Sequence, residues 1–331
     1  MSPKQAKCSC ESPAVHRHGG RRRRCARCGY TWSIRPVRPG RKSAIVSVEL
    51  ARRMLSDRES TRGLARARHC SVETIRRRCR VACRSLVRTT ALPKLPSVSE
   101  SPLALIADGL WCRFGHEHWV LYCMAVKPVG IPTAFFLEPV LLQGREDSRH
   151  WRRALATIPP AVMMRLKALV SDGFRGAKRI ARTHRWVLQG CHRHLDAMLW
   201  GKSKQHKRRL RGGAVRKAII KAVREARTTP DPRRVEELYQ VLQHCAKQPD
   251  LTVRIRGTVR RFLHDLTLYR TYLDYPELSL PTTTNAVESR NSRLREVLKC
   301  VNSPAAAALR VQTYTRLHPS ITCNHRENPQ N

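Results

Sequence analysis

Leu103-Ala-Leu-Ile-Ala-Asp108-Gly109 is an apolar run with the length of a buried strand, and it ends in an acid followed by glycine. Leu166-Lys-Ala-Leu-Val-Ser-Asp172-Gly173 repeats this pattern further along the chain. Short apolar runs predict further strands, and apolar spacings of three and four predict helices between them. The strands are expected at residues 119–126, 133–137 and 186–190, and the helices near 150–158 and 174–183. The order β-β-β-α-β-α-β predicts an α/β domain with a mixed sheet.

The net charge is the strongest compositional signal. The 331 residues include 65 Lys and Arg against 24 Asp and Glu, for a formal net charge of +41. A phosphate polymer relieves such self-repulsion and releases counterions when it binds. The composition therefore favours a nucleic-acid partner, with a membrane surface or a heparin-like polyanion as the alternative.

Thirteen cysteines with scattered spacing argue against a secreted disulfide framework. The first residues contain no apolar core of a signal peptide. No apolar run approaches the roughly 18 residues that a membrane-spanning helix needs. We therefore expect no membrane partner and a reducing compartment that contains DNA.

Changes in composition divide the chain into segments. Residues 1–40 are rich in Cys, Arg, Gly and His, and a prolyl linker separates a helical segment from the strands. The predicted segments are a metal-dependent module at 1–40, a helical DNA-binding domain at 43–90, a linker at 91–102, a catalytic domain at 103–317 with a helical insertion at about 195–280, and a frayed tail at 318–331.

Three acids form the candidate catalytic set. Asp108 and Asp172 each follow an apolar run, and Glu288 lies in the first turns of a helix capped by Thr or Asn. Carboxylates that converge from neighbouring strands repel one another unless a hard cation such as Mg²⁺ lies between them. Taken singly, an Asp-Gly pair also suits a turn, and a helix-start Glu suits the helix dipole. The alternatives to this set are Glu146, Asp147 and Asp196, whose polar surroundings predict that they are solvated.

The residue order resembles that of the Mutator-type DDE transposases and their bacterial insertion-sequence relatives. The resemblance covers roughly residues 103–317, and its most specific parts are Cys191-His-Arg-His194 and Asn285-Ala-Val-Glu288-Ser-Arg-Asn291. It implies an RNase H-like fold with a helical insertion before the glutamate. It also implies that Asp108, Asp172 and Glu288 bind Mg²⁺ or Mn²⁺. The residues expected to support that active site are Cys191, His194, Asn285 and Asn291.

The resemblance further implies a transposase that binds the terminal inverted repeats of a mobile element, cleaves DNA and joins the freed 3′-hydroxyl to target DNA. Two DNA ends must be held together, so a homo-oligomer is expected. The expected location is the bacterial cytoplasm, in association with the nucleoid. The alternatives are a DNA-binding regulator or inactive transposase-derived protein, and a nuclease that hydrolyses without joining.

The segment at 1–40 carries a candidate zinc site. Cys25-Ala-Arg-Cys28-Gly has the spacing of a zinc knuckle. Cys8-Ser-Cys10 supplies a shortened second pair, for which His16 or His18 are substitutes. The form resembles the zinc ribbons that precede transposase domains, and a basic tail with unligated thiols is the alternative. A basic run within this segment is expected to lie along DNA phosphates, and its members are Arg21, Arg22, Arg23 and Arg24.

Residues 60–77 have the pattern of a helix-turn-helix. Leu64 and Ala65 are expected to pack inward, and Ser71 to cap a second helix whose Val72 and Ile75 face the core. An ordinary helical hairpin is the alternative, because His69-Cys70 stands where the turn glycine is usual. The residues of the second helix that would face DNA bases or phosphates are Glu73, Thr74, Arg76 and Arg77.

Overall fold

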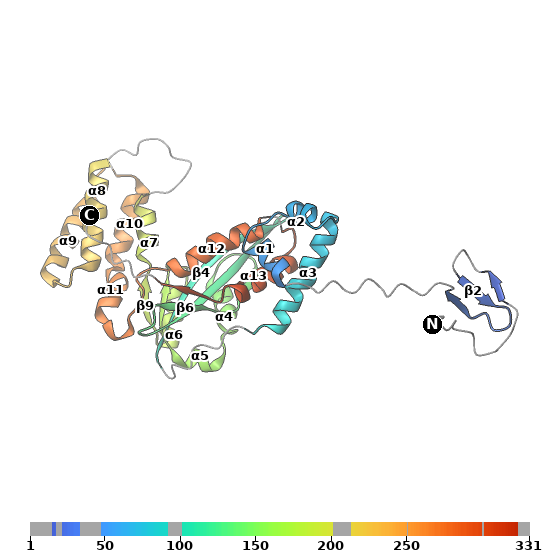
Figure 1. Cartoon of the computed structure of the whole chain (residues 1–331). Helices are drawn as coiled ribbons and strands as arrows, with labels where there is room; N and C mark the ends of the chain where they lie inside the picture. Colours follow the sequence, from blue (N-terminus) through green and yellow to red (C-terminus); the bar gives the residue numbers. More distant parts are fainter. Residues whose placement is uncertain are drawn as a thin grey trace. The chain divides into compact units, whose positions relative to one another are not determined.

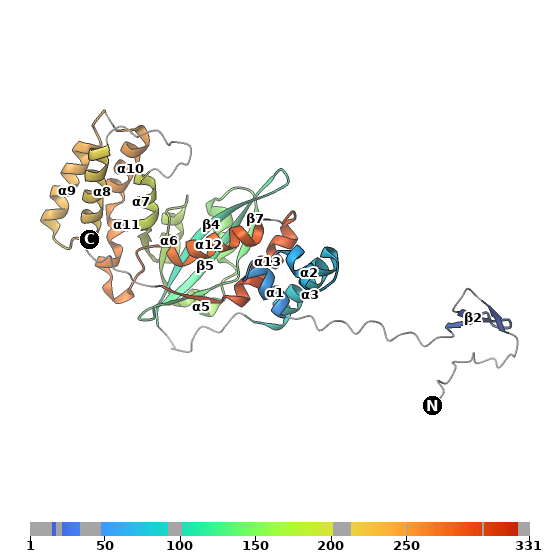
Figure 2. The ribbon, with the colours of Figure 1, turned by 45° about the horizontal axis from the view of Figure 1, so that its top comes forward.

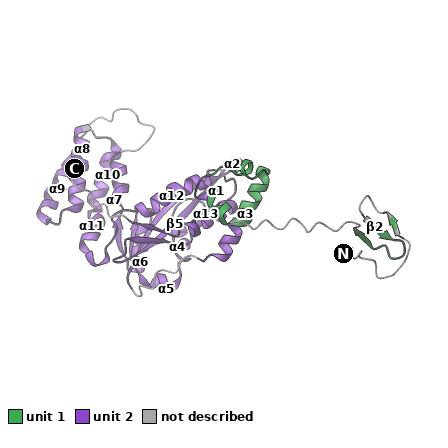
Figure 3. Cartoon of the chain, viewed as in Figure 1, with its two compact units in different colours: residues 1–54, 59–82 green, residues 55–58, 83–331 purple. Residues whose placement is uncertain are grey.

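The structure, a computed structural model, describes residues 15–17, 22–33, 48–91, 101–200, 213–249, 251–299 and 301–323 (Figure 1). It has two compact units (Figure 3), one of residues 1–54 and 59–82, the other of residues 55–58 and 83–331. No helix among the described residues is both long and apolar enough to cross a membrane. The basic run at 202–211 and most of the predicted linker lie outside the described residues.

The first unit contains a small antiparallel sheet and a helical part. The sheet consists of β1 (Val15–Arg17), β2 (Arg22–Cys25) and β3 (Thr31–Ser33). The helices are α1 (Val48–Leu55), α2 (Thr61–Ala67) and the first part of α3 (Val72–Thr89). Their core contains Leu50, Leu64, Ala65, Ile75 and Cys79.

A seven-stranded mixed sheet forms the centre of the second unit. Its order is β10-β6-β5-β4-β8-β9, and β7 pairs with β5. β4 is antiparallel to β5 and parallel to β8, and β8 is parallel to β9. The strands are β4 (Leu103–Phe114), β5 (Glu117–Pro128), β6 (Thr133–Phe136), β7 (Val140–Gln143), β8 (Leu166–Ser171), β9 (Val187–Gly190) and β10 (Ser320–Thr322).

The two faces of this sheet carry different helices. Alternate residues of β4, such as Leu105, share a core with Trp151 and Ile180, which belong to α4 (Ser148–Leu155) and α6 (Ala177–His184). α5 (Pro160–Arg165) leads into β8. The other face of β4 contacts α12 (Asn285–Leu298), which is followed by α13 (Pro304–Leu317). Figure 2 shows α12 running along the sheet.

The predicted helical insertion is present at the β9 end of the sheet (Figures 1 and 2). It has its own core, which includes Leu199, Val223, Leu242 and Phe262. A short 3₁₀ turn at Pro276–Leu278 follows it. Its helices are α7 (His192–Trp200), α8 (Gly213–Thr228), α9 (Pro232–Cys245), α10 (Val253–His264) and α11 (Leu266–Asp274).

Two predictions of the fold were wrong in detail, and two elements were not predicted. β4 does not end at Asp108, because its pairing with β5 continues to Phe114 opposite Glu117. The predicted frayed tail contains a strand, since residues 320–322 pair with β6. β7 and α5 were not predicted, because short, half-exposed segments such as these have weak apolar periodicity.

Candidate active site

Asp108 of β4 and Asp172, which directly follows β8, are neighbours at one end of the sheet's parallel part. The parallel pairing of β4 and β8 continues to Ala107 opposite Ser171, so the two acids follow as the next pair. Side chains alternate between the faces of a strand. Since Leu105 and Leu169 belong to the core beneath α4 and α6, Asp108 points toward the face that carries α12.

Asp108 is held by a buried amide and surrounded by other acids. Asn291 of α12 is 1% exposed and donates from Nδ2 to Asp108 Oδ2 over 2.7 Å. Burial, followed by the charges of Asp172, Glu288 and Glu146, raises the pKa of Asp108 to about 7, although the Asn291 hydrogen bond opposes the shift. The metal-free site therefore disfavours a full set of charged carboxylates.

Glu288 reaches the same region from the first turn of α12. Thr284 Oγ1 donates to its Oε1 over 2.8 Å, and the Cys191 thiol lies 3.8 Å from the same oxygen. Its Oε2 forms an ion pair with Arg193 Nε at 3.0 Å. Both carboxylate oxygens of Glu288 are thus engaged by residues of this chain.

Buried Arg290 anchors α12 over the sheet. Its guanidinium carbon lies 3.5 Å from the ring centroid of Phe136 in β6, and Nη2 donates to the His318 carbonyl. Burial lowers the pKa of Arg290 to about 10. A cation stacked on an aromatic ring in this way fixes the helix, so that Glu288 and Asn291 both face the strand acids.

Asp172 lies beside the first turn of α7. His194 Nδ1 is 4.0 Å from Asp172 Oδ2, while burial raises the pKa of Asp172 and the His194 charge opposes that shift. Asp172 Oδ1 has no hydrogen-bond partner among the described residues. Cys191 Sγ accepts from the backbone amides of His194 and Thr284, each over 3.4 Å. Cys191 N also donates to the Ser171 carbonyl over 2.8 Å, so Cys191 joins the end of β8 to the start of the Glu288 helix.

Glu146 was predicted to be solvated, and this prediction was wrong. It is half-buried, and its Oε1 accepts from the Trp151 indole at 2.9 Å. Burial raises the pKa of Glu146, and the charge of Asp172 raises it further. Glu146 lies in the polar segment 144–149, which favours a solvated side chain. The signal for its burial was Trp151, an aromatic hydrogen-bond donor five residues later. Asp147 is 47% exposed and caps α4, as a solvated acid can.

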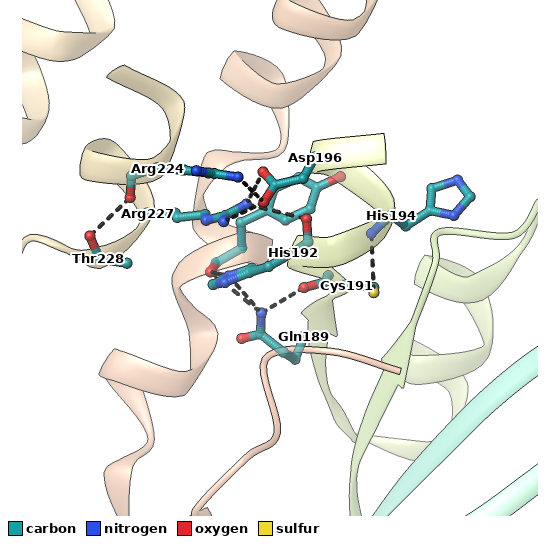
Figure 4. A network of polar contacts seen from close by, with 10 residues as sticks. Gln189, Cys191, His192, His194, Asp196, Arg224, Arg227 and Thr228 are labelled. Carbon is teal, nitrogen blue, oxygen red and sulfur yellow. Dashed lines mark hydrogen bonds and ion pairs between the residues drawn. The ribbon is translucent and has the colours of Figure 1, made fainter. Parts of the chain in front are cut away.

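Asp196 is also not solvated. Figure 4 shows it beside Arg227, whose Nη1 and Nη2 lie 2.9 and 3.1 Å from the two Asp196 oxygens. His192 Nε2 donates to the Tyr269 carbonyl over 2.7 Å, and burial lowers the pKa of His192 to about 4. His194 points away from this network in Figure 4. Residues at the start of α7 therefore contact two regions. His192 and Asp196 contact the insertion, and His194 lies beside Asp172.

An open cleft of about 750 Å³ runs from the acids to the insertion. Asp172, Glu146 and His194 line one part, and helices α10 and α11 line another. Exposed Trp111 of β4 is also part of its wall. The basic residues along it are Arg175, Lys178 and Arg261. The cleft thus brings acids, an aromatic face and cationic side chains together.

No family model matches this chain, and a search of curated proteins finds no match. The functional assignment therefore depends on the geometry of the site.

The donor set fits a hard divalent cation in chemical type. Asp108, Asp172 and Glu288 are carboxylates, which Mg²⁺ and Mn²⁺ prefer. Asp172 Oδ1 and Asn291 Oδ1 are buried acceptors without a hydrogen-bond partner among the described residues. No three His, Cys, Asp or Glu side chains of the described residues form a ready-made metal cage. Contacts of Glu288 with Arg193 and Thr284 compete with metal ligation. Asn285, the other predicted supporting residue, is exposed at the start of α12.

The N-terminal sheet contains half of the predicted zinc ligands. Cys25 is buried and Cys28 is exposed, and Gly29, with φ +70°, closes the turn by donating to the Cys25 carbonyl over 3.0 Å. His16 lines the same pocket as both cysteines. Arg22, Arg23 and Arg24 lie in β2. The other predicted zinc and phosphate contacts, Cys8, Cys10, His18 and Arg21, lie outside the described residues.

The two-helix geometry predicted at residues 60–77 is confirmed. Leu64 and Ile75 are fully buried, and the Ser71 hydroxyl accepts from the Thr74 amide over 3.1 Å. His69 adopts φ +45° at the turn, where glycine is usual. The predicted outward residues Glu73, Arg76 and Arg77 are exposed, and Thr74 is half-buried.

Proposed function

We propose that this protein is a DDE-type transposase that cleaves and joins DNA with divalent cations. The observation that supports it is the convergence of Asp108, Asp172 and Glu288 from β4, the end of β8 and α12, close enough for their charges to act on one another. These acids lie 64 and 116 residues apart in the sequence, and a helical insertion precedes Glu288.

The fold assignment within this proposal is an RNase H-like catalytic domain. It is supported by a central strand with an antiparallel neighbour on one side and a parallel neighbour on the other. The acids on two adjacent parallel strands and the acid on a helix over the same face suit this assignment. The insertion between β9 and α12 also suits it.

Each residue of the site would have a different role in phosphoryl transfer. Asn291 orients Asp108, while Thr284 and Cys191 orient Glu288. Arg193 is 59% exposed beside Glu288 and can turn to a DNA phosphate. Bound at the carboxylates, a pair of Mg²⁺ or Mn²⁺ ions would supply activation of a water or 3′-hydroxyl and stabilisation of the leaving oxygen.

The proposed partners are transposon ends and target DNA, held by a homo-oligomer in the nucleoid of a bacterial cytoplasm. The helix-turn-helix would recognise the terminal inverted repeats through Glu73, Thr74, Arg76 and Arg77. The N-terminal sheet would hold Zn²⁺ at Cys25 and Cys28 with further ligands from Cys8, Cys10 or His16. Its arginines would contact phosphates.

The test is a strand-joining assay with purified protein, Mn²⁺ and end-labelled DNA that carries the inverted repeats. The proposal predicts joined products with the wild type and none with Asp108→Ala, Asp172→Ala or Glu288→Ala, while each variant still retards the DNA. Cleavage without joining would indicate the nuclease alternative. Retarded DNA with no cut product would indicate a regulator or an inactive derivative.

A further inference from the structure

Glu146 lies directly over the residue that follows Asp108. A Cβ on Gly109 would lie 2.7 Å from Glu146 Oε1 and 2.8 Å from its Cδ. Only glycine leaves room for the Glu146 carboxylate at this point of β4. Gly109 is therefore a close-approach glycine within a strand, although the Asp-Gly pair suggested a turn.

Two neutral indoles hold the Glu146 carboxylate. Trp151 Nε1 donates over 2.9 Å, and the Trp111 side chain also hydrogen-bonds to Glu146. Among the described residues, no Lys, Arg or His forms an ion pair with Glu146, and its charge and that of Asp172 repel. A half-buried carboxylate placed beside other acids is costly unless a cation compensates for it.

Beyond the end of β8, Glu146 lies close enough to Asp108 and Asp172 for their charges to interact. The β4–β8 pairing ends at Ala107 and Ser171, so β4 continues alone past Asp108 on this side. Glu146 approaches from the face of α4, and Glu288 approaches from the face of α12. Glu146 and Asp172 both line the cleft described above.

A second observation points to a cation beside Asp108. Asn291 is 1% exposed and directs its Nδ2 to Asp108, yet its Oδ1 has no hydrogen-bond partner among the described residues. The same is true of Asp172 Oδ1. Buried acceptors without a donor are rare unless a water or an ion satisfies them.

We propose that Glu146 is a fourth carboxylate ligand of the divalent-cation site formed by Asp108, Asp172 and Glu288, an inference that rests on the proposed function. Four carboxylates carry the charge that two divalent cations neutralise. The Trp151 and Trp111 indoles position the carboxylate, and Gly109 keeps its place open.

The experiment measures Mn²⁺ binding to the purified full chain, from the electron paramagnetic resonance signal of free Mn²⁺, so that catalysis is not required. Glu146→Gln removes the charge and keeps the shape of the side chain. Gly109→Ala keeps every charge and displaces the carboxylate. Asp147→Asn is the matched control, because it removes the adjacent, exposed acid and still caps α4. Asp172→Asn is the reference for loss of a proposed core ligand.

The expected result is at least a ten-fold weaker Mn²⁺ affinity for Glu146→Gln and for Gly109→Ala, and a change below two-fold for Asp147→Asn. Circular dichroism and gel filtration check that each variant is folded. If Glu146→Gln fails to fold, Gly109→Ala decides.

Three results would overturn the inference. Wild-type affinity in Glu146→Gln and Gly109→Ala, with loss in Asp172→Asn, would exclude Glu146 and leave the proposed function intact. Equal weakening in Asp147→Asn would show a general charge effect. A wild-type chain that binds no Mn²⁺ would overturn the inference together with the metal site on which it rests.

Discussion

At the residue scale, the site is a group of acids whose ionisation in the folded protein costs free energy. Burial and three neighbouring carboxylates raise the pKa of Asp108 to about 7, and burial also raises the pKa of Asp172 and Glu146. A raised pKa means that the folded chain resists ionisation of the group. Perturbed carboxyl groups of this kind concentrate at functional sites, because their charge is used there.

Asp108→Asn should stabilise the metal-free protein at high pH. The folded pKa near 7 lies above the ordinary value of 3.8, so the stability that Asp108 contributes is complete below pH 3.8 and is lost as pH rises to 7. Asparagine removes this loss and still accepts from Asn291. Urea unfolding in EDTA should show a gain on the order of 3 kcal/mol at pH 8 and a smaller gain at pH 5. A less stable variant at pH 8 would contradict a buried, repelled charge.

Arg193→Ala should strengthen Mn²⁺ binding at the site. The Arg193 side chain is 59% exposed and occupies Glu288 Oε2 at 3.0 Å, so its removal frees one carboxylate oxygen. Exposed ion pairs contribute up to about 1 kcal/mol, which corresponds to a gain of roughly two- to five-fold. Arg233→Ala, which removes an exposed arginine of α9, should leave the affinity unchanged. Weaker Mn²⁺ binding in Arg193→Ala would show that Arg193 supports the metal site instead.

At the element scale, α7 is the junction between the insertion and the acids. Its first turn carries His194 beside Asp172, while Asp196 and His192 connect to α8 and α11. Thr271 of α11 also donates to the Leu188 carbonyl of β9 over 2.8 Å. Polar contacts therefore fix the insertion to the strand that precedes the Cys191 turn.

Arg227→Ala should destabilise the protein far more than Arg224→Ala. Both arginines pair with Asp196, but Arg227 is 7% exposed and makes two short contacts, whereas the Arg224 side chain is 46% exposed and lies 3.3 Å away. Loss of Arg227 leaves the Asp196 charge largely buried and poorly paired, at a cost of about 3 kcal/mol. Loss of Arg224 should cost less than about 1 kcal/mol. Urea unfolding followed by circular dichroism measures both, and equal losses would contradict the difference.

The elements that could be predicted are those whose apolar pattern is continuous. The runs ending at Asp108 and Asp172 and the helical insertion have such patterns, and the register of β4 and β8 then places the two acids side by side. The end of β4 could not be predicted, because Trp111 and Arg113 are exposed there and interrupt the apolar pattern. The strand continues because it pairs with β5 as far as Phe114. Glu146 was missed because its burial depends on Gly109 of β4 as well as on nearby Trp151.

At the scale of the whole molecule, a chain with a net charge of +41 contains a small group of interacting acids. The charges of Asp172, Glu288 and Glu146 act on Asp108. Two of these acids, Glu146 and Asp172, line the cleft, and arginines and a lysine line it too. Basic surroundings attract a polyanion, while the local acids attract divalent cations. Substitution of the acids is therefore expected to weaken metal binding and not DNA binding, and substitution of basic residues is expected to weaken DNA binding.

DNA binding by the full chain should weaken steeply with salt, and the active-site acids should not affect that slope. Each phosphate neutralised by Lys or Arg adds about −0.9 to the slope of log K against log salt concentration, so roughly six contacts give about −5. Fluorescence anisotropy with duplex DNA from about 50 to about 300 mM NaCl measures this slope, in a buffer without Mg²⁺, Mn²⁺ or chelator so that the proposed Zn²⁺ is kept. Asp172→Ala should keep the wild-type slope and lose strand joining, whereas Arg76→Ala with Arg77→Ala should make the slope shallower by one to two. A wild-type slope near zero would contradict phosphate contacts as the source of affinity. It would also contradict the inference that the net charge serves to bind DNA.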